Sequence, residues 1–350
     1  MLRHLQRFRN AESATSLVLT VALVALCVYF TARSDRFLTV GNLQVIVANY
    51  SVIAVATVGM AILMISGPVD LSLGSTVGAT GTLMALMVHD HHWPAALAIL
   101  FAVGVGAAIG AVNGSLVALA DFNPVIVTLG TQLFVRGALE LIRDTPVFEL
   151  GPTFRTIGAG RWLGLPVQGW IAAAVFVAGG VFLTLTPWGR YVYAIGINRQ
   201  AAYLSALPVR LLPFLLYVAT GAGAGLAGML LAARLNGASP GDQGLGFELQ
   251  ALTAVLLGGV AWAGGRGRLT GVLLALVFLG VLENGLTLLN VSPFVQMVVR
   301  GLALVVAAGL DALSTRLTGR VRFRQRAVAQ TTAAIEPAEP RDTPAEPAQV

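Results

Sequence analysis

The chain has 350 residues, of which 56% are hydrophobic and only 11% are charged, and its 22 basic and 16 acidic side chains give a formal net charge of +6. Soluble domains carry about 25% charged residues, so this composition and the mean hydropathy of +0.80 exclude a soluble globule and predict an all-α polytopic membrane protein. Every basic residue is an arginine, and without a lysine the chain has neither a Walker-type ATP site nor a Schiff base.

The apolar segments predict about ten membrane-spanning helices, because each approaches the ~20 residues that cross a bilayer. They lie near residues 17–30, 43–65, 71–89, 94–119, 124–142, 167–186, 211–233, 248–262, 269–289 and 295–313. The first lacks a small-x-small cleavage site, so we expect a retained helix rather than a signal peptide. With the N-terminus inside, most arginines fall on that side, which predicts two cytoplasmic termini.

Three regions follow from this pattern. Residues 1–16 form a cytoplasmic N-terminus, residues 17–313 a transmembrane domain, and residues 314–350 a basic segment with a tail too poor in large apolar residues to fold. The basic segment is a positive-inside anchor or contacts anionic membrane lipid. Positive-inside topology explains the arginines better than nucleic acid, which we do not expect as a partner.

A short internal echo links GAVNGSLVALADFNPVIV, which starts at Gly110, with GVLENGLTLLNVSPFVQ, which starts at Gly280. Each contains a glycine, an Asn-Gly pair, an apolar stretch and a proline. On the predicted topology the two turns lie on opposite sides of the membrane, which indicates an inverted repeat. Chance similarity is the alternative.

Two stripes of small residues predict close helix packing. Their members are Ala102, Gly106, Gly110 and Gly114 in one helix and Gly221, Gly225 and Gly228 in another. Metal chemistry has less support, since Cys27 is the only cysteine and the HDHH cluster at 89–92 has no second ligand set. We expect no metal site and no internal disulfide.

The stretch SGPVDLSLGS, from Ser66 to Ser75, interrupts apolar sequence with a Gly-Pro break. A helix restarts after it, and Asp70 is a natural cap for that helix. A broken helix inside a membrane is tolerated where protein or a water-lined path satisfies its backbone. Asp70 is therefore a candidate for the translocation path, with a plain capped turn as the alternative.

Further polar side chains lie within apolar spans, where they are costly and default to functional candidates. The candidates for the translocation path are Asn113, Thr128, Gln132, Glu283, Asn284 and Gln296. Hydrogen bonding between helices is the competing explanation. Arg136 and Glu140 are four residues apart and can pair on one helix face, whereas Arg300 has no obvious local partner.

The stretch 188–210 is the interior segment that separates two long apolar blocks. Asn198 can cap a short helix that Pro208 ends, and Ala202, Ser205 and Ala206 would give it a shallow face of small residues. Such a face suits docking of a partner. An ordinary cytoplasmic loop held on its side by arginines explains the same features.

Four segments resemble motifs of the bacterial ribose-type ABC sugar permeases, part of the superfamily that includes branched-chain amino-acid permeases. SGPVDLSLGS is similar to their G-G-I-D-L-S-x-G-S motif and FNPVIVTLGT, from Phe122, to their P-F-I-x-T-L-G segment. ELQALTAVLLGGVAWAGGRGRLTG, from Glu248, and the following GVLENGL resemble a third motif. IGINRQAAYLSAL resembles the cytoplasmic G-G-N-x-x-A-A-x-x-S-G-I loop, although Ile197, Ala206 and Pro68 replace glycines of these patterns.

The resemblance implies the membrane-spanning subunit of an importer in the bacterial inner membrane. Such a subunit is not an enzyme and binds no cofactor, because a separate ATP-binding cassette ATPase uses the ATP. A periplasmic binding protein delivers the substrate, typically a sugar, and two copies form a homodimer. The residues that would dock on the ATPase are Gly196, Asn198, Ala201, Ala202 and Ser205.

Three other functions stay open on the sequence. A branched-chain amino-acid ABC permease is the nearest. An ion-coupled secondary transporter is compatible with the echo and with the intramembrane Glu283. A passive channel would need neither ATP nor an ion gradient.

Overall fold

The computed structural model describes residues 2–309, with side chains from residue 16 onward. The predicted tail 314–350 and the last residues of the predicted span 295–313 lie outside the described residues. The helices are α1 Leu2–Arg33, α2 Val40–Ser66, α3 Leu73–His89, α4 Ala95–Gly114, the π-helix η1 Ser115–Leu119, α5 Pro124–Ile142, α6 Pro152–Ala159, α7 Val167–Leu185, α8 Pro187–Ile197, α9 Arg199–Leu204, α10 Leu211–Leu235, α11 Phe247–Leu257 and α12 Leu269–Leu288, followed by a last helix Pro293–Gly309.

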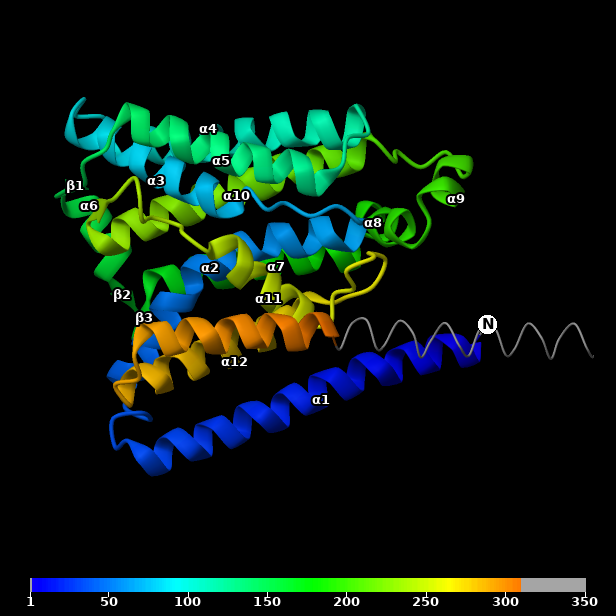
Figure 1. Ribbon diagram of the computed structural model, residues 1–350, viewed down its shortest axis with the longest axis horizontal. Coiled ribbons are helices and arrows are strands. Elements are labelled where there is room, and N and C mark those ends of the chain that lie inside the picture. Colours follow the sequence, from blue (N-terminus) through cyan, green and yellow to red (C-terminus); the bar gives the residue numbers. More distant parts are fainter. Residues whose placement is uncertain (1, 310–350) are drawn as a thin grey trace, which may run out of the picture. The chain divides into compact units, whose positions relative to one another are not determined.

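Two-residue strands form two small antiparallel pairs. β1 Val147–Phe148 pairs with β4 Gly237–Ala238, and β2 Arg161–Trp162 pairs with β3 Leu165–Pro166. Figure 1 shows α6 and the strands β1, β2 and β3 at the end of the helices opposite to α9, and β4 pairs with β1 there. This is the arrangement that the predicted topology requires if α9 is cytoplasmic and α6 external.

Within the described residues, seven helices are long and apolar enough to cross a membrane, which confirms a polytopic helical membrane protein. The seven are Ser16–Arg33, Val40–Ser66, Ala95–Leu119, Pro124–Ile142, Val167–Leu185, Leu211–Leu235 and Leu269–Leu288. Three predicted spans correspond to shorter helices, α3, α11 and Pro293–Gly309. α11 has 11 residues and ends after Leu257, where Gly259 adopts a φ of 86°. The count of ten therefore stays a prediction.

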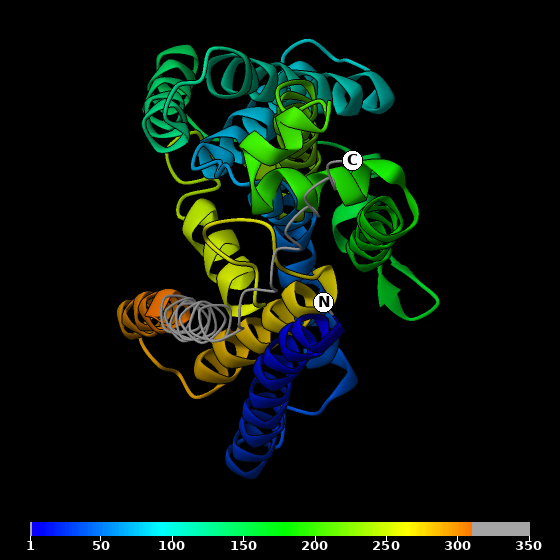
Figure 2. The same ribbon diagram turned by 90° about the vertical axis from the view of Figure 1, so that its right-hand side faces the viewer.

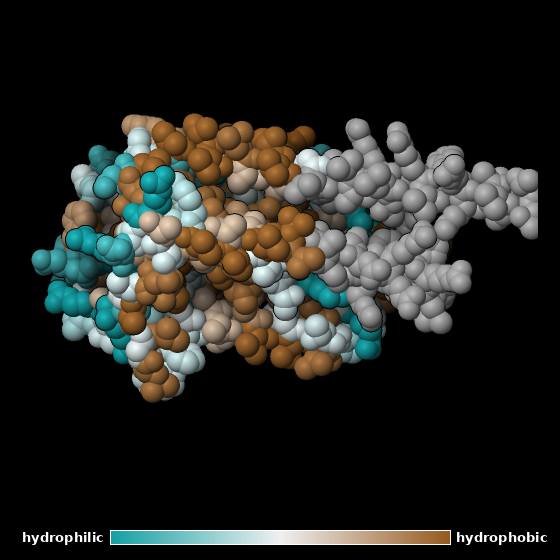
Figure 3. Space-filling view, turned by 90° about the horizontal axis from the view of Figure 1, so that it is seen from below, coloured by the Kyte–Doolittle hydropathy of each residue, from teal (hydrophilic) through white to brown (hydrophobic). Residues whose placement is uncertain are grey.

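The core lies around α2 and α10, which are more buried than α4, α5 and α7. α10 packs on α4, α3 and α2, and α1 packs on α12 (Figures 1 and 2). Apolar side chains cover much of the face seen in Figure 3, with hydrophilic ones gathered at one end. α1 and the last helix both carry several exposed large apolar side chains. Exposed apolar faces of this kind suit lipid contact.

The predicted glycine packing is confirmed between α4 and α10. A Cβ at Gly106 would lie 2.2 Å from the carbonyl oxygen of Gly221, and one at Gly225 would lie 2.4 Å from that of Ala102. Any larger residue would force the two backbones apart.

The break between α2 and α3 is present as predicted, with Gly67 at a φ of 120°. The expected cap is wrong: the N-cap of α3 is Ser72, and Asp70 lies two residues earlier. The two turns of the echo each place a left-handed residue three positions before a proline, Asp121 with a φ of 59° and Asn290 with a φ of 55°. The inverted repeat itself stays a prediction.

Candidate functional site

The segment 188–210 folds into two helices, of which the sequence pattern indicated only the second. Asn198 caps α9 as predicted, because its side-chain oxygen accepts a hydrogen bond from the backbone of Ala201 at 2.9 Å. α9 ends at Leu204, before the predicted limit, and Ala206 turns the chain with a φ of 56°. Pro208 follows.

The exposed face of α9 is larger and more apolar than the sequence suggested. Ala201 and Ser205 are exposed, as are 67% of Tyr203 and 80% of Leu204. The expected exposure of Ala202 is wrong, because this residue is 4% exposed and packs into the protein's own core. Ala202 therefore anchors α9 on the bundle, and its neighbours form the outward face.

Gly196 allows α8 to lie directly on the backbone of α2. A Cβ at this position would stand 2.0 Å from the carbonyl oxygen of Ile65 and 2.4 Å from the backbone nitrogen of Gly265. The backbone of Gly265 in turn donates to the same Ile65 oxygen at 2.8 Å. The helix before α9 is thus in contact with the α2 end, next to the break at Gly67.

Asp121, in the turn before α5, joins the same end of the bundle. It accepts from Arg199 at 2.7 Å and from Arg210 at 3.1 Å. The hydrogen bond from Arg199, together with the positive charges of the two arginines, lowers the pKa of the Asp121 carboxyl. The two arginines flank α9, so Asp121 fixes that helix relative to α5.

A first polar network connects the α2–α3 break to two other helices. Asp70 accepts from the backbone and the hydroxyl of Ser72, at 2.9 and 2.6 Å. Asn113 on α4 donates to the Ser72 hydroxyl at 2.8 Å and accepts from Thr131 on α5 at 2.6 Å. Asp70, Ser72 and Asn113 are at most 2% exposed, so the broken segment is satisfied by protein.

The predicted residue Thr128 does not join this network. Its hydroxyl donates to the carbonyl of Pro124 in its own helix, at 2.8 Å. The backbone of the break is held from another side, since Tyr217 on α10 donates to the carbonyl of Val69 at 3.0 Å.

A second network lies between α5 and the segment that leads into α11. Gln132 donates to Glu248 at 3.0 Å, and the other carboxylate oxygen of Glu248 is buried without a hydrogen-bond partner. The expected Arg136–Glu140 pair is wrong: the Arg136 guanidinium donates to the carbonyls of Pro240 and Gln243, at 3.0 and 2.9 Å. Backbone carbonyls from a distant part of the chain thus take the place of the expected carboxylate of Glu140.

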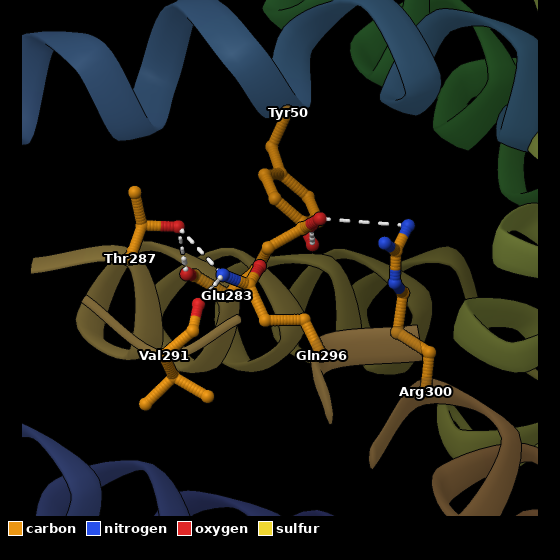
Figure 4. A network of polar contacts seen from close by, with 6 residues as sticks. All are labelled: Tyr50, Glu283, Thr287, Val291, Gln296 and Arg300. Carbon is orange, nitrogen blue, oxygen red and sulfur yellow. Dashed lines mark hydrogen bonds and ion pairs between the residues drawn. The ribbon is translucent and has the colours of Figure 1, made fainter. Parts of the chain in front are cut away.

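A third network surrounds Glu283 (Figure 4). One carboxylate oxygen accepts from Tyr50 on α2 at 2.5 Å, and the other pairs with Arg300 at 3.5 Å. Gln296 donates to Thr287 at 3.3 Å and to the carbonyl of Val291 at 3.0 Å. These contacts join α2, α12 and the last helix.

Asn284, the neighbour of Glu283, exchanges two side-chain hydrogen bonds with Asn42, both of 2.9 Å. This pair and the Tyr50–Glu283 bond both tie α12 to α2. Glu283 and Asn284, both predicted for the translocation path, thus also hold two helices together.

A cavity of about 310 Å³ opens beside this third network. α2, α10, α11 and α12 form its walls. Its polar lining consists of Asn49, Tyr50, Arg234, Gln250, Glu283, Asn284 and Thr287. A volume of this size lies at the lower end of the range for small-molecule sites.

The structure separates the predicted path residues into several places. Asp70 and Asn113 share the first network, Gln132 lies in the second, and Glu283 and Asn284 reach the cavity. Sequence reasoning missed Tyr50, Arg234, Gln250 and Ser72 as members of these sites. In the sequence, Arg234 is one of several arginines at the end of an apolar span.

The described residues contain no group of three or more metal-ligating side chains of the His, Cys, Asp and Glu types. In the HDHH cluster, His89 bonds Asp90 at 2.7 Å, and Arg143 lies 3.5 Å from the same carboxylate.

Residues 42–308 match the protein family described as branched-chain amino acid transport system / permease component. The ribose import permease protein of Escherichia coli (strain K12) is 38% identical over 296 residues, 83% of this chain and 92% of that protein. The L-arabinose transport system permease protein of the same strain is 33% identical over 304 residues, 84% of this chain and 89% of that protein. The D-allose transport system permease protein of the same strain is 30% identical over 297 residues, 85% of this chain and 91% of that protein. No solved structure matches the chain.

Proposed function

We propose, since this chain belongs to the family of branched-chain amino acid transport system permease components, that it carries a sugar across the bacterial inner membrane as the permease subunit of an ATP-driven importer. The chain is a transport component and not an enzyme. Relatives named for ribose, L-arabinose and D-allose support the sugar. The observation that carries the proposal is the exposed, capped and doubly clamped α9.

α9 is the docking element for a partner ATPase. Tyr203 and Leu204 project from a short helix whose position is fixed by Asn198 on its own backbone and by Asp121 across the bundle. A small, rigid apolar surface of this kind can enter a groove on a partner with little loss of conformational entropy. The partner binds and hydrolyses the ATP.

Two contacts carry movement of α9 into the membrane. Through α8, Gly196 presses on the end of α2, next to the break that holds Asp70. Through Asp121, α9 is tied to α5, whose Thr131 and Gln132 belong to the first two networks. A shift of α9 therefore acts on the end of α2 and on α5, and the first polar network connects the break after α2 to α5.

At the other end, the cavity beside Glu283 is the place where a delivered substrate first meets polar side chains. Its carboxamides and hydroxyls can exchange hydrogen bonds with sugar hydroxyls. In this proposal a periplasmic binding protein delivers the sugar to this end, and two copies of the chain form the complete transporter. Both termini then lie on the cytoplasmic side, with α9.

Uptake into vesicles tests the proposal. The chain is reconstituted with its ATPase, and the binding protein is added outside with labelled ribose or leucine. The proposal predicts ribose uptake that requires ATP and both partners. Uptake by the chain alone, driven by an ion gradient or by none, would contradict it, and ATP-driven uptake of leucine but not ribose would favour an amino-acid permease.

The orientation is tested by labelling. In a Cys27→Ser background, single cysteines at Arg155 and Arg199 should react from opposite sides of the membrane, with Arg155 outside. Reaction of both from the same side would contradict the predicted topology.

A further inference from the structure

Arg234 is a cation in the cavity wall for which no described residue supplies a counter-charge. It lies in the last turn of α10, half-buried, and lines the cavity of about 310 Å³. Among the described residues its guanidinium has no ion pair and no side-chain hydrogen bond. A guanidinium has five N–H donors, and a partly buried one is costly unless these and its charge are matched.

The other charged side chain of the cavity is already balanced. Glu283 pairs with Arg300 and accepts from Tyr50, so its negative charge is not available to Arg234. The charges at this site therefore sum to one positive charge, which resides on Arg234. A ligand that brings a single negative charge would neutralise it.

The remaining lining indicates what else the ligand carries. Asn49, Gln250 and Thr287 lie on three different helices around the cavity and offer both donors and acceptors. Hydroxyl groups are matched by such side chains, whereas an amino acid's ammonium would need a free carboxylate. A compact ligand with several hydroxyls and one anionic group fits both observations.

We propose that this cavity binds a sugar acid, whose carboxylate is held by Arg234 and whose hydroxyl groups contact the carboxamides and the hydroxyl of the lining. The inference rests on the proposed import function and makes sugars with a carboxylate the preferred ligands within the sugar class. Arg234 is then the residue that determines specificity, because guanidinium–carboxylate pairs form two parallel hydrogen bonds.

A phospholipid phosphate is the other oxyanion within reach of an arginine at a span end. The cavity favours the sugar acid, because its polar groups line walls from four helices and exceed what one phosphate contacts. The two sources are separated by working in a polyoxyethylene detergent, whose headgroup contains neither phosphate nor sugar.

The test measures binding of D-ribonate and D-ribose to the full-length chain, co-purified with its ATPase in that detergent. The wild type should bind ribonate more tightly than ribose. Arg234→Gln should weaken ribonate binding by more than about tenfold, the effect of losing a charge-assisted contact, while leaving ribose binding little changed. Arg234→Lys should retain part of the affinity, and the matched control Arg155→Gln, at an exposed arginine on α6, should retain all of it.

Equal affinity for ribose and ribonate, unchanged ribonate binding by Arg234→Gln, or an equal loss in Arg155→Gln would overturn the sugar-acid site. Arg234-dependent stabilisation by added phospholipid but not by ribonate would overturn it as well. Each of these results leaves the proposed function intact if ATP-driven sugar uptake persists. Failure of all ATP-driven uptake would instead contradict the proposed function.

Discussion

Asp121 accepts a hydrogen bond of 2.7 Å from Arg199, a residue 78 positions further along the chain. The contact joins the turn between η1 and α5 to the first residue of α9. Arg210, on the other side of α9, binds the second oxygen of the same carboxylate at 3.1 Å. One acidic side chain thus binds the first residue of the docking helix and the residue that precedes α10.

Asp121→Asn should uncouple α9 from α5 without unfolding the protein. The amide keeps the size of the side chain but loses both ion pairs, and exposed pairs add little to stability. We expect the melting temperature and the binding of the ATPase to be nearly unchanged. The stimulation of ATP hydrolysis by loaded binding protein should fall several-fold, and unchanged stimulation would contradict the role of the clamp.

The same pair gives a pH prediction. The pKa of the Asp121 carboxyl is lowered by the hydrogen bond from Arg199, so it lies below the unfolded value of about 3.9. A lowered acid pKa means that the contact is complete above the unfolded pKa and is lost as the pH falls through the folded pKa. The difference in stimulation between wild type and Asp121→Asn should therefore be constant from about pH 5 to pH 8. A difference that disappears within this range would point to another titrating group.

Gly196→Ala tests the contact between α8 and α2. The added Cβ would stand 2.0 Å from the carbonyl oxygen of Ile65, so α8 has to shift, at a cost of about 1–3 kcal/mol. We expect a lower melting temperature and weaker stimulation of ATP hydrolysis. Gly180→Ala on α7 is the control, because nothing lies within 4 Å of the Cβ it adds. Equal behaviour of the two variants would show that the close approach is unimportant.

Glu283 and Arg300 should depend on each other. Glu283→Gln leaves Arg300 without its counter-charge, and Arg300→Gln does the same to Glu283. The double variant should lose less stability than the sum of the losses in the two single variants. The difference is the coupling energy, which we expect to be about 0.5–3 kcal/mol. Thermal unfolding of the four proteins measures it. Strict additivity would mean that the pair does not hold the last helix to α12.

Asn113→Ala should destabilise the α2–α3 break, because it removes the buried carboxamide that donates to the Ser72 hydroxyl and accepts from the Thr131 hydroxyl. The expected loss is about 1–3 kcal/mol, with reduced transport. Thr128→Val is the matched control, since the Thr128 hydroxyl donates to the carbonyl of Pro124 in its own helix. Similar losses in both variants would contradict a special role for the first network.

Features that depend on neighbouring residues could be predicted from the sequence. The break follows from Gly67 and Pro68, and the cap of α9 from Asn198, because each is a local preference of the backbone. The glycine stripes of α4 and α10 were recognisable because small residues at helical spacing have one main use.

Features that depend on how helices meet could not be predicted. Arg136 has an acidic neighbour one turn away, yet it bonds carbonyls more than 100 residues distant. Arg300 finds Glu283 only after the last helix folds back on α12. Small residues such as Ala202 fit both a buried and an exposed face of a short helix. The sequence of α9 therefore could not show that Ala202 is buried.

Binding of the ATPase to α9 is the most direct test of the account. Ala201 is exposed on this helix, and Ala201→Trp should block close docking while leaving the bundle intact. Thr153→Trp, at an exposed position on α6 at the opposite end, is the control. The measurement is co-purification of the ATPase with each variant, together with hydrolysis stimulated by loaded binding protein. The account predicts that Ala201→Trp loses the ATPase or its stimulation and that Thr153→Trp keeps the ATPase. Full association and full stimulation in Ala201→Trp would contradict it.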